Sequence, residues 1–112
     1  MKILILGANG MIGHTIFDVL YRDNAINCYG LVRLNSIDRD FKCKSLSNII
    51  AYQNAENTSD IFKILNSQKP DIIINCIGIT KHLPCYSDTL QVFTINSLLP
   101  HKLSSYCLEN SI

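Results

Sequence analysis

The sequence has few charged residues and no large excess of either sign. Charged side chains make up 17% of the 112 residues, and ten basic against nine acidic residues give a formal net charge of +1. A chain so nearly neutral has no field that would attract nucleic acid or an anionic membrane. We therefore expect no nucleic acid and no membrane among its partners. With 47% hydrophobic residues, the chain can form one ordinary domain rather than a disordered tail, a collagen or a coiled coil.

Long hydrophobic runs are also missing. The longest, from Ile72 to Ile79, is interrupted by Asn75 and Gly78, whereas a membrane-spanning helix needs about 20 apolar residues. The aliphatic stretch after Met1 is too short for the apolar region of a signal peptide, and no cleavage site follows it. These absences predict a cytoplasmic protein.

The cysteines and histidines show no clustering. The five cysteines include no Cys-x-x-Cys pair, and the three histidines are scattered. An odd number of cysteines does not suit a secreted disulfide framework, and a zinc site needs clustered ligands. We therefore expect reduced thiols and no metal site.

What the chain does have is an alternation of strand-like and helix-like segments. Short aliphatic runs predict strands at 2–6, 27–32, 48–52 and 71–77, and helical patterns fall between them at 12–20 and 58–68 and after them at 89–108. Pro100 should kink or divide the last helix. This order predicts an α/β fold with a Rossmann-type, doubly wound parallel sheet, incomplete at about four strands in the order 3-2-1-4.

Apolar periodicity predicts which helical positions face the core. In the first helix these are Ile12, Ile16, Val19 and Leu20, and in the last helix Leu90, Phe93, Leu99, Leu103 and Cys107.

A glycine-rich turn joins the first strand to the first helix: Gly7-Ala8-Asn9-Gly10-Met11-Ile12-Gly13. A turn this tight needs a positive φ, which glycine tolerates. A second glycine lets the backbone approach a pyrophosphate, and a third lets helix and strand pack together. The N–H groups of the first helical turn then face the phosphates, aided by the helix dipole. We predict that Gly7, Asn9, Gly10, Met11, Ile12 and Gly13 bind a dinucleotide cofactor.

The same turn also occurs in two other contexts. No Gly-Lys-Ser/Thr follows, which excludes a Walker-type phosphate loop. A glycine-rich turn with a purely structural role stays open.

The residue at the end of the second strand bears on which dinucleotide binds. In dinucleotide-binding folds a carboxylate there selects NAD, and an arginine accommodates the 2′-phosphate of NADP. Arg33 lies 20 positions beyond Gly13, and no acidic residue occurs between Ala25 and Ile37. A guanidinium can bind a phosphate with two hydrogen bonds. We predict NADP(H), with NADPH preferred over NADH; the alternative is that Arg33 is a solvated loop residue. The missing carboxylate also argues against an S-adenosylmethionine methyltransferase.

The G-x-x-G-x-x-G spacing resembles the phosphate loop of the extended short-chain dehydrogenase/reductases, and the resemblance runs from Met1 to about Leu108. Segments 69–78 and 95–103 are most similar to the dTDP-4-dehydrorhamnose reductase (RmlD-like) group, whose members reduce a 4-keto sugar on a nucleotide with NADPH. The resemblance implies a nucleotide-sugar substrate for the full-length protein and a nicotinamide cofactor.

The resemblance also implies further cofactor-binding residues. Asn54 and Ala55 match the segment after the third strand that binds adenine, with Glu56 as an alternative and a polar loop as another. Cys76, Ile77 and Gly78 match the segment that passes beside the ribose and phosphates. Asn96 matches an asparagine that supports the site through backbone contacts, although a polar residue on the helix surface stays open.

The catalytic residues that the family uses are absent from these 112 residues. The family needs a Ser or Thr after a fifth strand and a Tyr-x-x-x-Lys pair, and none of the five tyrosines has a lysine four positions later. We therefore expect residues 1–112 to be the N-terminal cofactor-binding part of an oxidoreductase, without its substrate domain and with no catalytic residue. Alternatives are an epimerase or dehydratase of the same family, a non-catalytic NADP-binding regulatory module, and a truncated frame without function. A homodimer is left open.

Overall fold

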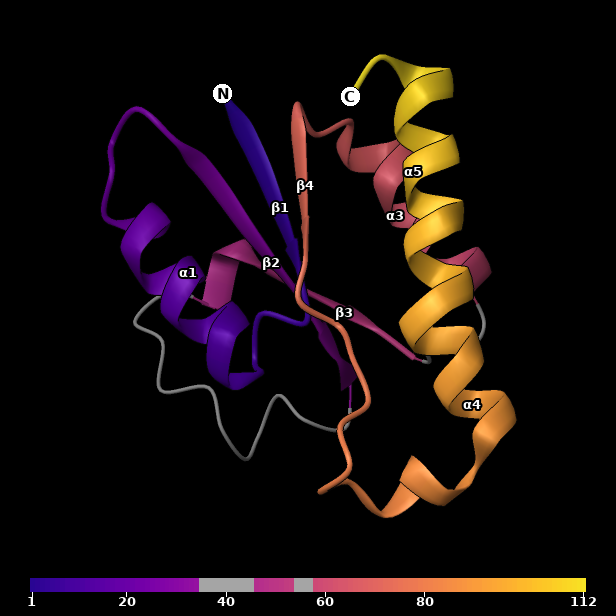
Figure 1. The fold of residues 1–112 in the computed structure, drawn as a ribbon. Coiled ribbons are helices and arrows are strands. Elements are labelled where there is room, and N and C mark those ends of the chain that lie inside the picture. The colour runs from indigo at the N-terminus through magenta and orange to yellow at the C-terminus, as the bar shows by residue number, and fades with distance from the viewer. Residues whose placement is uncertain (35–45, 54–57) are drawn as a thin grey trace. The chain divides into compact units, whose positions relative to one another are not determined.

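Four short aliphatic runs form one parallel sheet in the computed structural model of the chain, which describes residues 1–34, 46–53 and 58–112. The strands are β1 (Lys2–Leu6), β2 (Asn27–Arg33), β3 (Ile49–Tyr52) and β4 (Ile72–Asn75). They lie in the order β3-β2-β1-β4 (Figure 1). This confirms the prediction of a Rossmann-type, doubly wound α/β sheet in the order 3-2-1-4.

The position of β1 inside the sheet follows from its composition. Its partners run from Lys2↔Asn27 to Leu6↔Leu31 on one side and from Ile3↔Ile72 to Leu6↔Asn75 on the other. Leu4, Ile5 and Leu6 are wholly buried, as expected for an uninterrupted aliphatic strand in a parallel sheet with both faces covered.

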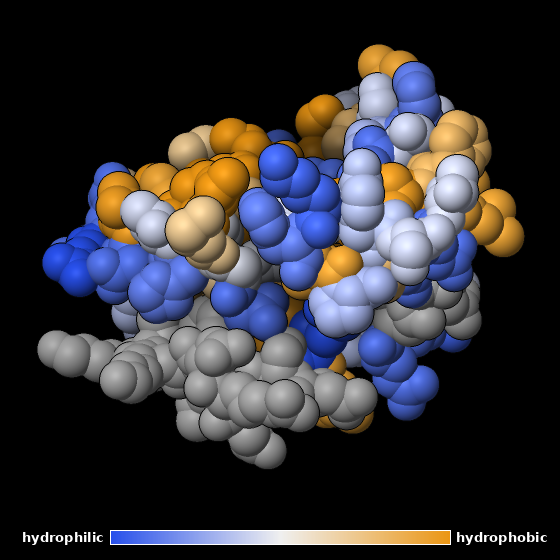
Figure 2. Space-filling model, turned by 60° about the horizontal axis from the view of Figure 1, so that its bottom comes forward, coloured by the Kyte–Doolittle hydropathy of each residue, from blue (hydrophilic) through white to orange (hydrophobic). Residues whose placement is uncertain are grey.

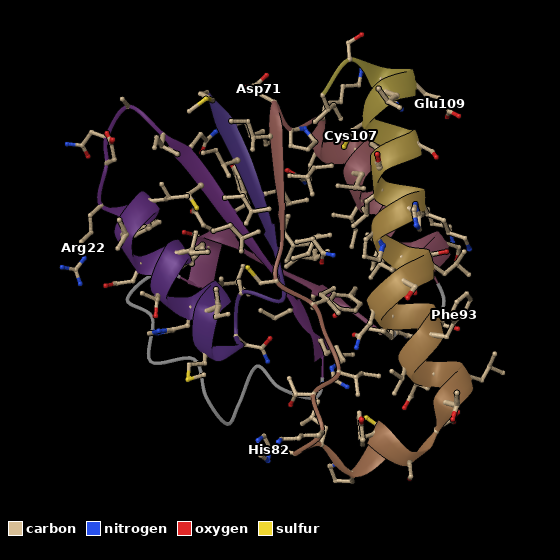
Figure 3. The ribbon with its side chains drawn as sticks, viewed as in Figure 1. Arg22, Asp71, His82, Phe93, Cys107 and Glu109 are labelled. Carbon is tan, nitrogen blue, oxygen red and sulfur yellow. The ribbon has the colours of Figure 1, made fainter. Side chains whose placement is uncertain are left out.

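Strand β4 is shorter than the sequence predicted and ends at Asn75 instead of residue 77. Its start is fixed to β1, because the Lys2 backbone N–H donates to the Asp71 carboxylate at 2.6 Å, and Asp71 lies where the strand begins (Figure 3). At the other end the Cys76 N–H donates to the Leu6 carbonyl at 2.9 Å. Pairing stops there because β1 itself ends at Leu6.

Helix α1 (Met11–Tyr21) packs on the sheet through a face that matches the predicted one only in part. Gly13 and Phe17 are buried, and Ile16 and Leu20 pack partly buried against the same core cluster. Ile12 and Val19 are 65% and 64% exposed, so placing them in the core was wrong. A pattern of hydrophobic residues misplaces the buried face of this helix because Gly13, at the centre of that face, has no hydrophobic side chain that the pattern could detect.

Helix α3 (Thr58–Gln68) connects β3 to β4, and its Ile61 and Leu65 are wholly buried. The chain leaves it through Lys69, which has a positive φ of 46°, and the following proline prevents the helix from continuing. Right-handed connections to strands on opposite sides of β1 place α1 and α3 on opposite faces of the sheet.

The chain divides into two compact units, Met1–Cys76 and Ile77–Ile112. The second contains α4 (Thr89–Phe93), a π-helical turn over Thr94–Leu98 and α5 (Leu99–Asn110). The π turn lies just before Pro100, which has no N–H to donate to the Asn96 carbonyl. The predicted helix at 89–108 is therefore continuous but irregular at the expected place.

Some of the predicted core positions of this second unit are at the surface. Leu99 and Leu103 are buried as predicted, but Leu90 and Phe93 are 75% and 58% exposed. Figure 3 shows the Phe93 ring projecting from the helical segment. Figure 2 likewise shows hydrophobic groups among the hydrophilic ones on the face that it presents. Within the described residues, no helix is long and apolar enough to cross a membrane.

Candidate dinucleotide-binding site

The glycine-rich turn after β1 is held by backbone hydrogen bonds to β2. The N–H groups of Gly7 and Ala8 both donate to the Leu31 carbonyl, at 2.9 and 3.2 Å, and the Gly10 N–H donates back to the Gly7 carbonyl at 3.0 Å. Gly7 has a φ of 73°, which confirms that the turn requires a residue tolerant of positive φ. The turn therefore has a fixed shape that the backbone itself maintains.

Gly13 allows the helix to come close to this turn. A Cβ built on Gly13 would lie 2.2 Å from the Gly7 carbonyl oxygen and 3.0 Å from the Ala8 Cα. No side chain fits in that space, so the third glycine is required for close packing, as predicted. The contact is with the backbone of the turn rather than with the strand.

The amino end of α1 is suited to an anion. Gly10 precedes the helix and the first turn contains no acidic residue. The first N–H groups of an α-helix have no partner within the helix, and here they belong to Met11, Ile12 and Gly13. Together with the positive end of the helix dipole they form a site that favours a phosphate. The backbone thus fits the diphosphate of a dinucleotide.

Arg33 is distant from this turn along the chain, but β2 brings it to the same edge of the sheet. It is the last residue of β2, two positions beyond Leu31, the residue that accepts the hydrogen bonds of the turn. Its side chain is exposed, and its register partner on β3 is Tyr52. The structure thus brings one cation and the amino end of α1 to the same edge of the sheet.

The predicted adenine-binding residues Asn54 and Ala55, and the alternative Glu56, lie outside the described residues. Their role stays a prediction.

Cys76 is half-buried and packs against the core cluster below the sheet edge. Burial raises the pKa of its thiol, which disfavours the reactive thiolate form. Cys76 directly follows β4, and its role beside the cofactor stays a prediction.

In the second unit, Asn96 holds the segment that follows β4. Its side-chain Oδ1 accepts a hydrogen bond from the Ile79 N–H, and its Nδ2 donates to the Ile79 carbonyl, both at 2.8 Å. A Cβ on the neighbouring Gly78 would lie 3.7 Å from Oδ1. Asn96 therefore uses both ends of its amide on the backbone of Ile79; its supporting role at a cofactor site stays a prediction.

Sequence reasoning missed three residues that shape this region, namely Ala8, Gly30 and Tyr52. Ala8 is wholly buried, and a Cβ on Gly30 would lie 2.8 Å from the Ala8 Cβ and 3.2 Å from the Phe17 ring. Gly30 makes room for the turn and for α1. Contacts between residues so far apart in sequence leave no local pattern.

Comparison with known proteins identifies the family. Residues 3–112 match the NAD dependent epimerase/dehydratase family. The chain belongs to this family. The bifunctional polymyxin resistance protein ArnA of Wigglesworthia glossinidia brevipalpis is 32% identical over 113 residues, which cover 96% of this chain and 16% of that protein.

Solved structures agree with this fold. A dTDP-4-dehydrorhamnose reductase from Clostridium acetobutylicum superimposes with a TM-score of 0.68 at 25% identity, covering 98% of this chain and 33% of that one. The enzyme WbmH of Bordetella bronchiseptica, solved in complex with NAD+, gives a TM-score of 0.72 at 14% identity, with 99% and 36% covered. The chain thus spans about a third of the length of these proteins. Both the description of the family and the WbmH complex name NAD.

Proposed function

We propose that this chain is the NADP(H)-binding half of a nucleotide-sugar reductase, similar to dTDP-4-dehydrorhamnose reductases, which transfer a hydride to a 4-keto sugar. The observation that carries the proposal is Arg33 at the carboxyl end of β2, beside a turn whose backbone fits a diphosphate. The similarity to the reductase from Clostridium acetobutylicum supports the substrate class.

In this proposal each part of the site has one task. The N–H groups at the start of α1 hold the diphosphate, and Arg33 holds the 2′-phosphate of the adenosine ribose. Asn54 and Ala55 contact the adenine, and Asn9, Cys76, Ile77 and Gly78 line the cofactor. Asn96 fixes the backbone of the segment that includes Ile79. The bound cofactor would supply the hydride; residues 1–112 supply binding and orientation.

The family description favours a second candidate, an epimerase or dehydratase acting on a nucleotide sugar. A non-catalytic NADP-binding regulatory module is a third, favoured by the lack of a Tyr-x-x-x-Lys pair in these residues. Both would bind the same cofactor, so the binding test below applies to all three candidates. Measuring which reaction the full-length protein catalyses, if any, distinguishes the three.

The test is the affinity of the chain for NADPH and NADH, measured by calorimetry before and after Arg33→Ala. Loss of a charge-assisted hydrogen bond should weaken the binding of NADPH by about 1.5–3 kcal/mol, or about tenfold to a hundredfold in affinity. The affinity for NADH should stay nearly unchanged. Arg22→Ala is the matched control, because Arg22 pairs with Asp18 on α1 at 2.5 Å, at the end far from the turn. Equal losses for both nucleotides would refute the role of Arg33.

A further inference from the structure

The carboxyl end of β3 places a buried aromatic residue next to Arg33. The register of β2 and β3 runs from Gly30↔Ile49 to Arg33↔Tyr52. Register partners on neighbouring strands, about 4.8 Å apart, present their side chains on the same face of the sheet. Tyr52 is therefore the direct neighbour of the residue that we expect to discriminate between NADP and NAD.

This register is fixed by contacts elsewhere on the two strands. The Asn48 side-chain Nδ2 donates to the Cys28 carbonyl at 2.9 Å and ties the start of β3 to β2. Further along, the side chain of Ile49 packs so closely over Gly30 that a Cβ there would lie 2.9 Å from the Ile49 Cδ1. A slip of β3 by one residue would break both contacts and turn Tyr52 to the opposite face.

The two side chains differ in their surroundings. Tyr52 is only 5% exposed, so its ring is held in one place, whereas Arg33 is exposed and its long side chain has many rotamers. Burial raises the pKa of the Tyr52 phenol, and the nearby Arg33 guanidinium acts in the opposite direction. The phenol therefore stays neutral and lies within electrostatic reach of the guanidinium.

We propose that Tyr52 is a positioning residue for Arg33, whose fixed aromatic ring supports the guanidinium at the tip of β2 and so sets the preference for a 2′-phosphorylated nucleotide. The inference rests on the proposed function. An arginine stacked on or packed against an aromatic ring loses less rotamer freedom when it binds a phosphate. Tyr52 itself need not touch the cofactor.

The first experiment compares the NADPH and NADH affinities of the wild-type chain with those of Tyr52→Leu and Tyr52→Phe. We expect Tyr52→Leu to lower the ratio of the two affinities by about threefold to tenfold through NADPH alone, and Tyr52→Phe to retain the ratio because it keeps the ring. In an Arg33→Ala background, Tyr52→Leu should leave the ratio unchanged. A fall of the same size in that background would overturn the inference, because Tyr52 would then act without Arg33.

A second measurement needs no ligand. The ionisation of Tyr52 is followed by ultraviolet absorbance, as the difference between chains with tyrosine and with phenylalanine at position 52. Arg33→Ala should raise the pKa of Tyr52, because it removes the nearby positive charge, and Arg22→Ala should not. An unchanged pKa in Arg33→Ala would contradict the pairing.

The two proposals fail in different ways. If the wild-type chain binds neither nucleotide, the proposed function is wrong and this inference falls with it. If the chain prefers NADPH and Tyr52→Leu does not alter the preference, this inference alone is wrong.

Discussion

Gly13 allows α1 to lie close to the turn that precedes it, because it has no side chain. Replacing it with alanine would put a Cβ 2.2 Å from a backbone oxygen, which neither side can relieve by rotating a side chain. We expect Gly13→Ala to lower the free energy of unfolding by about 1–3 kcal/mol, the usual cost of overpacking. Urea denaturation followed by circular dichroism measures this loss.

The matched control for that variant is Gly78→Ala. A Cβ on Gly78 would meet its nearest neighbour at 3.7 Å, an ordinary contact distance, and Gly78 has no positive φ. Its free energy of unfolding should change by less than about 0.5 kcal/mol. If both variants lose the same stability, the close contact at Gly13 is not the cause.

Burial of the Cys28 thiol makes stability depend on pH in the alkaline range. Burial raises the pKa of Cys28 from 9.0 to about 11. Above the lower value the unfolded chain releases this proton while the folded chain retains it, so the free energy of unfolding falls as pH rises from about 9 to about 11. Below that range the contribution is constant.

Urea denaturation should therefore give a lower free energy of unfolding at about pH 10 than at about pH 8, and Cys28→Ala should reduce this difference. An identical loss in Cys28→Ala and wild type would mean that other groups cause it.

At the residue scale, what could be predicted was what depends on neighbours in sequence. The conformation of Gly7 and the close approach at Gly13 follow from a strand-turn-helix sequence read locally, and both were found. Tyr52 was missed, because its proximity to Arg33 depends on the register of two strands joined by a long connection. No spacing within either strand carries that information.

At the element scale, the amide of Asn96 fixes the segment after β4. Asn96→Asp should weaken this contact because a carboxylate can accept from the Ile79 N–H but cannot donate to the Ile79 carbonyl. We expect a loss of about 0.5–1.5 kcal/mol in the free energy of unfolding, as for one hydrogen bond. Asn96→Ala should lose both bonds and expose the Ile79 amide.

Hydrogen exchange measures this effect directly at the Ile79 amide, which should exchange faster in Asn96→Ala. Ser97→Ala, at an exposed neighbouring position in the same π turn, is the control. An unchanged exchange rate at Ile79 in Asn96→Ala would show that the conformation of the segment after β4 does not depend on the Asn96 amide.

The existence and order of the elements could be predicted, but the faces of the helices could only partly be. Four aliphatic runs were enough to identify the strands and their order. In α1 the buried face is centred on a glycine, and in α4 Leu90 and Phe93 are exposed. Apolar periodicity records which residues are hydrophobic and not whether another surface of the same chain covers them.

At the scale of the whole molecule, the family relationship and the missing residues lead to one expectation about activity. The chain spans 33% of the related reductase from Clostridium acetobutylicum, and it lacks any Tyr-x-x-x-Lys pair. We expect residues 1–112, mixed with NADPH and a nucleotide 4-keto sugar, to show no oxidation of NADPH above the buffer rate. Without a placed proton donor, binding alone does not give turnover.

The fall in NADPH absorbance measures this, with the complete reductase from Clostridium acetobutylicum as the positive control. Turnover by the 112-residue chain would mean that its proton donor is a residue not yet assigned here.

The central position of β1 has a consequence for synthesis on the ribosome. β1 is synthesised before β4, its partner on one side, and the Lys2 backbone is hydrogen-bonded to a residue 69 positions away. Contacts this distant in sequence form slowly, and domains emerge at about 5–20 residues per second. For several seconds, therefore, β1 lacks its β4 partner on one edge, and chaperones that bind extended aliphatic segments can bind it during that interval.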